Sequence, residues 1–318
     1  MELFLGMIPA ILYYTTPLVI AGLGGLYSER SGVVNIALEG IMVMGAVAAA
    51  IVTYELESLP GMMTIAPWIG LLVAIIVGVL FSWLHAYASV SLNADQTISG
   101  TALNILSLGL AVFVCQILYQ QERSITWIGG LKKGFPLLED IPVLGWIFKE
   151  SYPTFWIGIA LVIITYFVLY KTRFGLRFRS CGEFPQASES VGINVHKMRY
   201  IGVLTSGGFA GLAGGIMCLT LGSGQFTATV IHGFGFIAIA TLIFGKWHPF
   251  GVLGASLFFG FSQVLSLYAN SIPVLNLLPQ VFYYIFPYAV TIVALIIFSN
   301  TKGVGPKAAG EIYDRGKR

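Results

Sequence analysis

Charged side chains are scarce in this chain. Only 10% of its 318 residues are Asp, Glu, Lys or Arg and 57% are hydrophobic, whereas a soluble domain carries about 25% charged residues. The mean hydropathy is +0.85, and no polar stretch is long enough to build a large soluble core. The composition therefore predicts an all-α, polytopic integral membrane protein. The small net charge of +3 gives no reason to expect a nucleic-acid partner.

The sequence also lacks the motifs that mark common catalytic sites. It contains no G-x-x-x-x-G-K-[ST] phosphate loop, no H-E-x-x-H zinc motif and no G-x-S-x-G nucleophile turn. Its three cysteines, Cys115, Cys181 and Cys218, form no C-x-x-C pair and no metal-binding spacing. We therefore expect no catalytic residue, no bound metal and no hydrolysis of ATP through a phosphate loop in this chain.

Long apolar runs predict about nine transmembrane helices, because a run of roughly 20 apolar residues can cross a bilayer. The seventh run is short, which suggests a broken or partial crossing. Pro9, Pro17 and the glycines at 22, 24 and 25 predict a kink or break in the first run. The predicted spans are Met7–Leu26, Val33–Thr53, Pro67–Ser89, Ser99–Tyr119, Thr154–Tyr170, Tyr200–Leu221, Ile231–Gly245, Gly251–Asn270 and Phe282–Ser299.

Basic residues orient these spans. The loop 171–199 and the tail 301–318 are both basic, so both are expected on the cytoplasmic side. Five spans precede the loop, which places the N-terminus outside together with the loop 120–153. Residues 1–300 are therefore predicted to form one transmembrane domain that is followed by a cytoplasmic tail.

Within the basic loop, Glu183 to Gly192 is predicted to form a short exposed helix. Pro185 suits the first turn of such a helix, and Gly192 suits its end. Ala187 and Ser188 are small enough for another protein to dock closely. The basic residues on either side either anchor the loop in the cytoplasm or contact that protein. They are Arg177, Arg179, Lys197 and Arg199.

Polar residues inside spans are costly and tend to face a cavity or another helix. Asn35 and Glu39 are four residues apart and share one helix face. An apolar run follows Glu39, so its carboxylate is expected at membrane depth. It is either a contact for a transported substrate or one half of a structural ion pair, with Arg30 as the candidate partner.

A second polar group lies at the start of the fourth span. Asn93 is expected to cap that helix, with Gln96 reaching back to it, and Asp95 suits the positive N-terminus. Gln96, Ser99 and Asn104 continue as a polar stripe along one face, which a cap alone does not require. A capping role and a substrate pathway lined by this stripe both remain open.

Small residues point to two further features. Gly207, Gly211 and Gly215 repeat every four residues and form a flat face on which another helix can pack closely. In residues 222–236, glycines and hydroxyl groups alternate with aromatic rings, and His232 among them is expected to be satisfied locally.

Several segments, taken in their order and spacing, carry a resemblance to one family. They are Ser28–Gly40, Asp95–Gly100, Phe174–Arg177 through Gly192-Ile193, Gly235–Ala240, Phe244–Gly251, Pro287-Tyr288 with Thr291, and Gly310–Tyr313. The chain resembles the permease subunits of ATP-binding-cassette (ABC) importers from the branched-chain amino acid and simple-sugar permease superfamily. Within that superfamily it is similar to the purine-nucleoside permeases that work with a basic-membrane-lipoprotein receptor.

The resemblance implies partners for the chain in the cell membrane of a prokaryote. They are a second permease subunit, expected to be a paralogue, two cytoplasmic ATP-binding domains, an external substrate-binding lipoprotein and membrane lipids. ATP and Mg²⁺ would bind the partner ATPase, so this chain needs no cofactor. The segment 183–192 would be the coupling helix that docks on the ATPase.

The resemblance also gives the polar residues a role as the lining of a substrate pathway. Amide groups suit the edge of a neutral nucleobase or the hydroxyls of a sugar. The candidate pathway residues are Asn35, Glu39, Asp95, Gln96, Ser99 and Asn104. The same machinery could carry simple sugars or a riboflavin-like vitamin. A secondary transporter or channel without an ATPase, and a membrane scaffold that transports nothing, are the other readings of the sequence.

Overall fold

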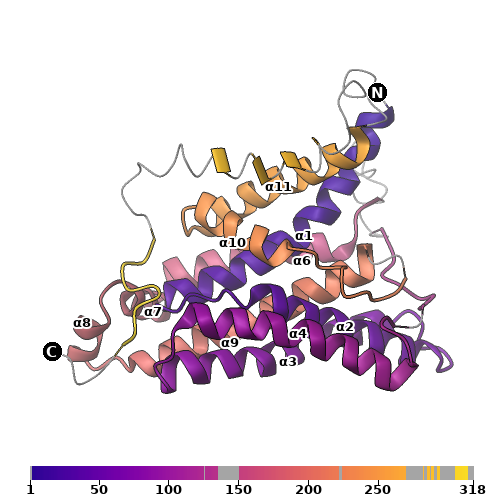
Figure 1. Ribbon diagram of the computed structural model, residues 1–318. Coiled ribbons are helices and arrows are strands. Elements are labelled where there is room, and N and C mark those ends of the chain that lie inside the picture. Colours follow the sequence, from indigo (N-terminus) through magenta and orange to yellow (C-terminus); the bar gives the residue numbers. More distant parts are fainter. Residues whose placement is uncertain are drawn as a thin grey trace.

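The computed structural model describes residues 2–124, 126–134, 150–221, 224–269 and 305–313, with 282, 285–286, 288–289 and 292–293. Over these residues the regular structure is helical, without strands (Figure 1). The α-helices are α1 (Glu2–Arg30), α2 (Leu38–Glu57), α3 (Ala66–Ala86), α4 (Gln96–Tyr119), α6 (Pro153–Tyr166), α7 (Arg173–Glu183), α8 (Pro185–Ser190), α9 (Val195–Leu221), α10 (Phe234–Phe244) and α11 (Pro249–Tyr268). Short π-helical segments, Tyr87–Ser91 and Phe167–Lys171, extend α3 and α6.

Seven helices in the described part of the chain are long and apolar enough to cross a membrane: α1, α2, α3, α4, α6, α9 and α11. They correspond to seven of the predicted spans. The predicted short crossing is α10, whose 11 residues extend about 16 Å at 1.5 Å per residue, about half of a bilayer core. The predicted ninth span, Phe282–Ser299, lies largely outside the described residues, as does much of the loop 120–153.

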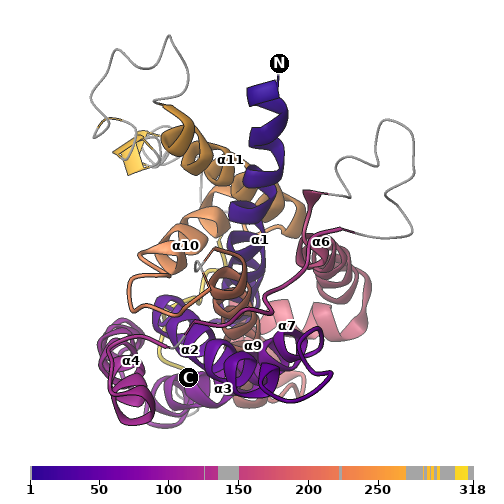
Figure 2. The same cartoon turned by 90° about the vertical axis from the view of Figure 1, so that its right-hand side faces the viewer.

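Helix α9 packs against α1, α2 and α3, and glycines make the contacts close (Figures 1 and 2). A Cβ atom added to Gly211 would lie 2.2 Å from the carbonyl oxygen of Ala74 on α3, and one on Gly207 would lie 2.0 Å from Ser82 Oγ. A Cβ on Gly215 would lie 3.0 Å from the Cβ of Ala74. The three glycines therefore sit where the backbones of α9 and α3 approach each other.

Helix α1 runs without interruption through Pro9 and Pro17, so it does not break as the prolines and glycines suggested. Its glycines serve packing instead. A Cβ on Gly24 would lie 2.9 Å from the carbonyl oxygen of Ser206 on α9. The chain leaves the α-helical conformation farther on, in residues 31–37 between α1 and α2.

Helices α7 and α8 and the segment 305–313 gather at one end of the helix bundle (left in Figure 1). The N-terminus lies away from that end. The charged residues of the basic loop therefore share one end of the molecule with the described part of the tail.

Candidate functional site

The interruption between α1 and α2 is held by polar side chains from other helices. Gln96 Oε1 accepts a hydrogen bond from the backbone N–H of Val34 at 2.7 Å, and His85 Nε2 lies 3.1 Å from the carbonyl oxygen of Val34. Asn104 Nδ2 donates to the carbonyl oxygen of Ile36 at 3.0 Å. Buried backbone groups outside a helix need hydrogen-bond partners, so these side chains stabilise the interruption.

The two asparagines join three helices around this interruption. Asn35 Nδ2 donates to Ser206 Oγ on α9 at 2.9 Å, and Asn35 Oδ1 accepts from the N–H of Ala37. Asn104 Oδ1 on α4 accepts from the N–H of Gly40 on α2 at 2.8 Å. Each amide thus uses both its oxygen and its nitrogen within the protein.

Helix α4 begins differently from the prediction. Its N-cap is Asp95, whose Oδ1 accepts from the N–H groups of Thr97 (2.8 Å) and Ile98 (2.9 Å). The predicted cap at Asn93 is wrong, because Asn93 lies before the cap with a φ of +52°. Gln96 cannot reach back to it, since its side chain binds the interruption between α1 and α2.

The polar stripe on α4 therefore meets protein atoms along its length. Ser99 Oγ lies 3.0 Å from His85 Nδ1. Gln96 is only 3% exposed, and its Nε2 has no hydrogen-bond partner among the described residues. That these residues line a substrate pathway stays a prediction. Within the stripe, the buried Nε2 of Gln96 is a donor that could still bind a ligand.

Glu39 binds the start of the short helix α10. Its Oε1 accepts from the N–H of Gly233 and its Oε2 from the N–H of Gly235, each at 2.6 Å. Positive φ angles at His232 (+38°) and Gly233 (+88°) turn the chain just before α10. A carboxylate at this position satisfies N–H groups that a helix leaves open and complements the positive end of its dipole.

The ion pair considered for Glu39 and Arg30 is not formed. Arg30 Nη1 instead lies 3.5 Å from Glu183 Oε1 at the end of α7. Arg30 Nε and Nη2 donate to the carbonyl oxygen of Trp247 at 3.3 and 2.9 Å, and Trp247 Nε1 donates to Glu29 Oε2 at 2.5 Å. Arg30 therefore joins the end of α1 to the basic loop and to the turn between α10 and α11.

Replacing Arg30 by lysine is expected to lower the melting temperature of the purified protein by several degrees. Lysine keeps the charge but cannot donate in the fork geometry that reaches Trp247 and Glu183 together. The loss of one charge-assisted hydrogen bond costs about 1.5–3 kcal/mol. Thermal unfolding in detergent measures the effect, and an unchanged melting temperature for Arg30→Lys would contradict this role.

A cavity of about 400 Å³ lies between α1, α9, α10, α11 and the loop before α10. It is bounded at α10 by Phe234, whose ring centroid is 6.0 Å from that of Tyr14. Ser124 fixes the loop, because its Oγ accepts from the N–H of Phe226 at 2.7 Å. The cavity is lined by Tyr14, Met217, Leu221, Gln225, Thr227, Val230, Phe234 and Gln263.

The chemistry of this cavity is polar but uncharged. Two aromatic rings, two amides and the hydroxyls of Tyr14 and Thr227 line it, and no Asp, Glu, Lys, Arg or His is found among the described residues of its lining. Glu39 neutralises the start of α10 beside it. Sites of this size hold small molecules, oriented by a few polar groups among apolar ones. The cavity therefore suits a neutral, planar ligand with hydrogen-bonding edges.

None of the six predicted pathway residues lines this cavity. The segment 222–236, noted in the sequence only for its alternation of glycines, hydroxyls and rings, contributes Gln225, Thr227 and Phe234. Tyr14 and Gln263 were missed, because each is a single residue in a long apolar run and carries no local pattern.

The short helix predicted within 183–192 is present as α8. Pro185 opens it, and Gly192 follows it with a φ of +83°. Ala187 is exposed. Ser188 is only 3% exposed and its Oγ donates to the carbonyl oxygen of Phe184, so it faces the protein and not a docking partner.

Arg199 differs from the other predicted anchors of the loop, because the tail covers it. It is only 1% exposed, and its Nη1 donates to the carbonyl oxygen of Glu311 at 2.9 Å. Arg177 and Lys197 are exposed. The basic loop therefore has one buried cation that is covered by the tail and others that remain accessible.

Comparison with known proteins yields one family and several full-length relatives. Residues 7–295 match the family described as branched-chain amino acid transport system / permease component. The chain is 48% identical over 314 residues to the guanosine ABC transporter permease protein NupQ of Bacillus subtilis, covering 98% of this chain and 97% of the relative. It is 42% identical over 315 residues to the nucleoside ABC transporter permease protein NupC of Lactococcus lactis, covering 96% of each.

A second permease of Bacillus subtilis is more distant. The guanosine ABC transporter permease protein NupP is 26% identical over 249 residues, covering 77% of this chain and 69% of the relative. No solved structure gives a significant match.

Proposed function

We propose that this chain, which belongs to the family of branched-chain amino acid transport system permease components, is the transmembrane permease subunit of an ABC importer for purine nucleosides. It is a multi-pass protein of a prokaryotic cell membrane. The nucleoside substrate is taken from the guanosine permease NupQ and the nucleoside permease NupC, each of which matches this chain almost from end to end.

The uncharged cavity carries the choice of substrate. An amino acid is a zwitterion, and in this cavity both of its charges would be buried without a partner, which is strongly unfavourable. A nucleoside is neutral, its base can stack on Tyr14 or Phe234, and its polar edges can bind Gln225 and Gln263. The cavity would thus receive the substrate, while the polar residues around Asn35 and Asn104 would shape the pathway beside it.

Partners would complete the importer. A second permease, expected to be a paralogue because Bacillus subtilis has both NupQ and NupP, would form the other half of the pathway. Two cytoplasmic ATPase subunits would bind ATP and Mg²⁺, and an external lipoprotein would deliver the nucleoside. Closure of the ATPases would move α8 and turn the cavity outward, and hydrolysis would reset the assembly.

The test is uptake of labelled guanosine, ribose and riboflavin by proteoliposomes. They would contain this chain with its co-purifying subunits, and the lipoprotein would be added outside. Guanosine uptake that requires ATP is the expected result. Uptake of ribose or riboflavin alone would keep the importer and change its substrate, and guanosine uptake by this chain alone under an ion gradient would overturn the mechanism.

The cavity itself is tested by Phe234→Ala and Gln263→Ala. Each is expected to lower guanosine uptake about tenfold, because stacking on the Phe234 ring contributes about 1–3 kcal/mol, loss of the Gln263 hydrogen-bond partner costs about 1–3 kcal/mol, and 1.4 kcal/mol is a factor of ten. The matched controls are Phe258→Ala and Gln116→Ala, whose side chains are exposed on α11 and α4. Equal uptake by the cavity variants and their controls would remove this cavity from the pathway.

A further inference from the structure

The segment 305–313 lies across the end of the molecule that carries α7 and α8 (Figure 1). The N–H of Ala308 donates to the carbonyl oxygen of Gly182, near the end of α7, at 2.9 Å. Lys307 Nζ lies 5.0 Å from the centroid of the Phe184 ring, directly before α8. The segment therefore contacts the chain on the approach to α8.

Tyr313 attaches the segment to α8 itself. It is 4% exposed, and its hydroxyl donates to a carboxylate oxygen of Glu189 on α8. Its ring centroid is 5.4 Å from that of His196, and the ring packs with Cys181 and Val195 in one buried cluster. Tyr313 thus joins α7, α8 and the start of α9.

Arg199 on α9 also binds the segment 305–313. Its guanidinium carbon lies 5.5 Å from the centroid of the Tyr313 ring, and its Nη1 binds the carbonyl oxygen of Glu311. Nε and Nη2 of Arg199 have no hydrogen-bond partner among the described residues. Loss of the segment would therefore leave a buried cation without its main partners, which is costly.

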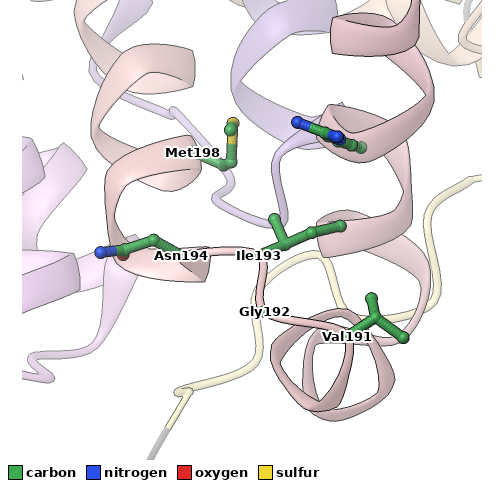
Figure 3. A pocket seen from close by; sticks show the side chains of 6 residues that line it. Val191, Gly192, Ile193, Asn194 and Met198 are labelled. Atoms are coloured by element: carbon green, nitrogen blue, oxygen red, sulfur yellow. The ribbon is translucent and has the colours of Figure 1, made fainter.

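A cavity of about 410 Å³ opens beside α8 (Figure 3). Ile193 and Met198, which line it, also pack against the cluster of Cys181, Val195 and Tyr313. Tyr313 of the segment 305–313 therefore helps to hold these two lining residues in place. The lining residues are Arg177, Val191, Gly192, Ile193, Asn194 and Met198.

The exposed surface of α7, α8 and the segment 305–313 is apolar and largely basic, with Glu311 as an exposed acid. Phe184 is 56% exposed and Val191 74% exposed. Arg177 and Lys197 are exposed, and Lys307 from the segment is exposed beside Phe184. Exposed apolar side chains among positive charges, at the end that carries the basic loop, are complementary to a protein face with carboxylates and apolar groups.

We propose that the segment 305–313 clamps α8 and completes a docking surface for an acidic face of the cytoplasmic ATPase. This proposal rests on the proposed function, because it requires an ATPase partner. Lys307 and Arg177 contact that partner, whereas Tyr313 is a positioning residue that acts through α8 and Glu189.

Tyr313→Ala tests the clamp through two readouts. Cys181 is fully buried under Tyr313, and burial raises the pKa of its thiol, so both access and reactivity are low. In the complex purified with its ATPase, we expect maleimide labelling of Cys181 to rise at least tenfold and the retained ATPase to fall at least tenfold. Ile312→Ala, at an exposed neighbour, is the matched control for labelling, and a Cys181→Ser background identifies the labelled thiol.

Arg177→Glu keeps the proposal testable if Tyr313→Ala fails to fold. It reverses a charge on the exposed cavity wall and leaves the clamp intact. We expect less retained ATPase with unchanged labelling of Cys181. Retention of the ATPase in the wild-type amount by either folded variant overturns the proposal. Neither readout involves substrate, so a wild-type complex that retains the ATPase but takes up no guanosine refutes the proposed substrate and not the clamp.

Discussion

Gly214→Ala is expected to lower the melting temperature of the purified permease by about 5 °C. A Cβ at this position would lie 1.9 Å from the carbonyl oxygen of Met42 on α2. That oxygen belongs to the backbone of a buried helix, so no side chain can rotate to make room, and α9 must move away from α2. Overpacking costs about 1–3 kcal/mol and sometimes more, and 1 kcal/mol shifts the melting temperature by about 2–4 °C in a chain of 150–250 residues.

The matched control is Gly109→Ala on α4, where an added Cβ meets no atom within 4 Å. Both variants replace a glycine inside a helix by alanine. The higher helix propensity of alanine by itself stabilises the helix by about 1 kcal/mol. Gly109→Ala is therefore expected to melt at or slightly above the wild-type temperature. Equal melting temperatures for the two variants would show that α9 and α2 are not in backbone contact.

Hydropathy predicted most of the membrane helices, since a bilayer core demands runs of apolar residues whatever their partners are. The same reasoning predicted the short seventh run, which is α10. The gap between the first two spans was predicted at residues 27–32, whereas the interruption between α1 and α2 lies at residues 31–37. Its cause is the non-local satisfaction of backbone groups at Val34 and Ile36 by Gln96, His85 and Asn104, and a sequence pattern within one run does not encode such partners.

The partners of the charged residues could not be predicted for the same reason. Glu39 binds the backbone near residue 233, and Arg199 is covered by residues near 311. Positive charge in a loop usually indicates exposed residues that hold the loop in the cytoplasm. The sequence therefore could not distinguish the buried Arg199 from the exposed basic residues near it. Only the fold brings the tail over α9 and shows the difference.

Glu39→Ala is expected to reduce nucleoside uptake to less than a tenth of the wild-type rate and to lower the melting temperature as well. The substitution removes both acceptors from the N–H groups of Gly233 and Gly235. Hydrogen bonds to charged groups contribute about 1.5–3 kcal/mol each, and the helix dipole adds to this. Without the carboxylate, the start of α10 loses its position, and with it Phe234 in the wall of the cavity.

Two readouts separate this structural role from direct contact with the substrate. If Glu39 holds α10, uptake and melting temperature fall together in Glu39→Ala, and Glu39→Gln is intermediate because the amide keeps one acceptor. If Glu39 binds substrate, uptake falls while the melting temperature of the substrate-free protein stays at the wild-type value. Glu55→Ala, at an exposed acid on the same helix, is the control and is expected to leave uptake unchanged. A carboxylate that anchors a partial helix beside an uncharged cavity would let the importer hold that wall in place without charge in the substrate's path.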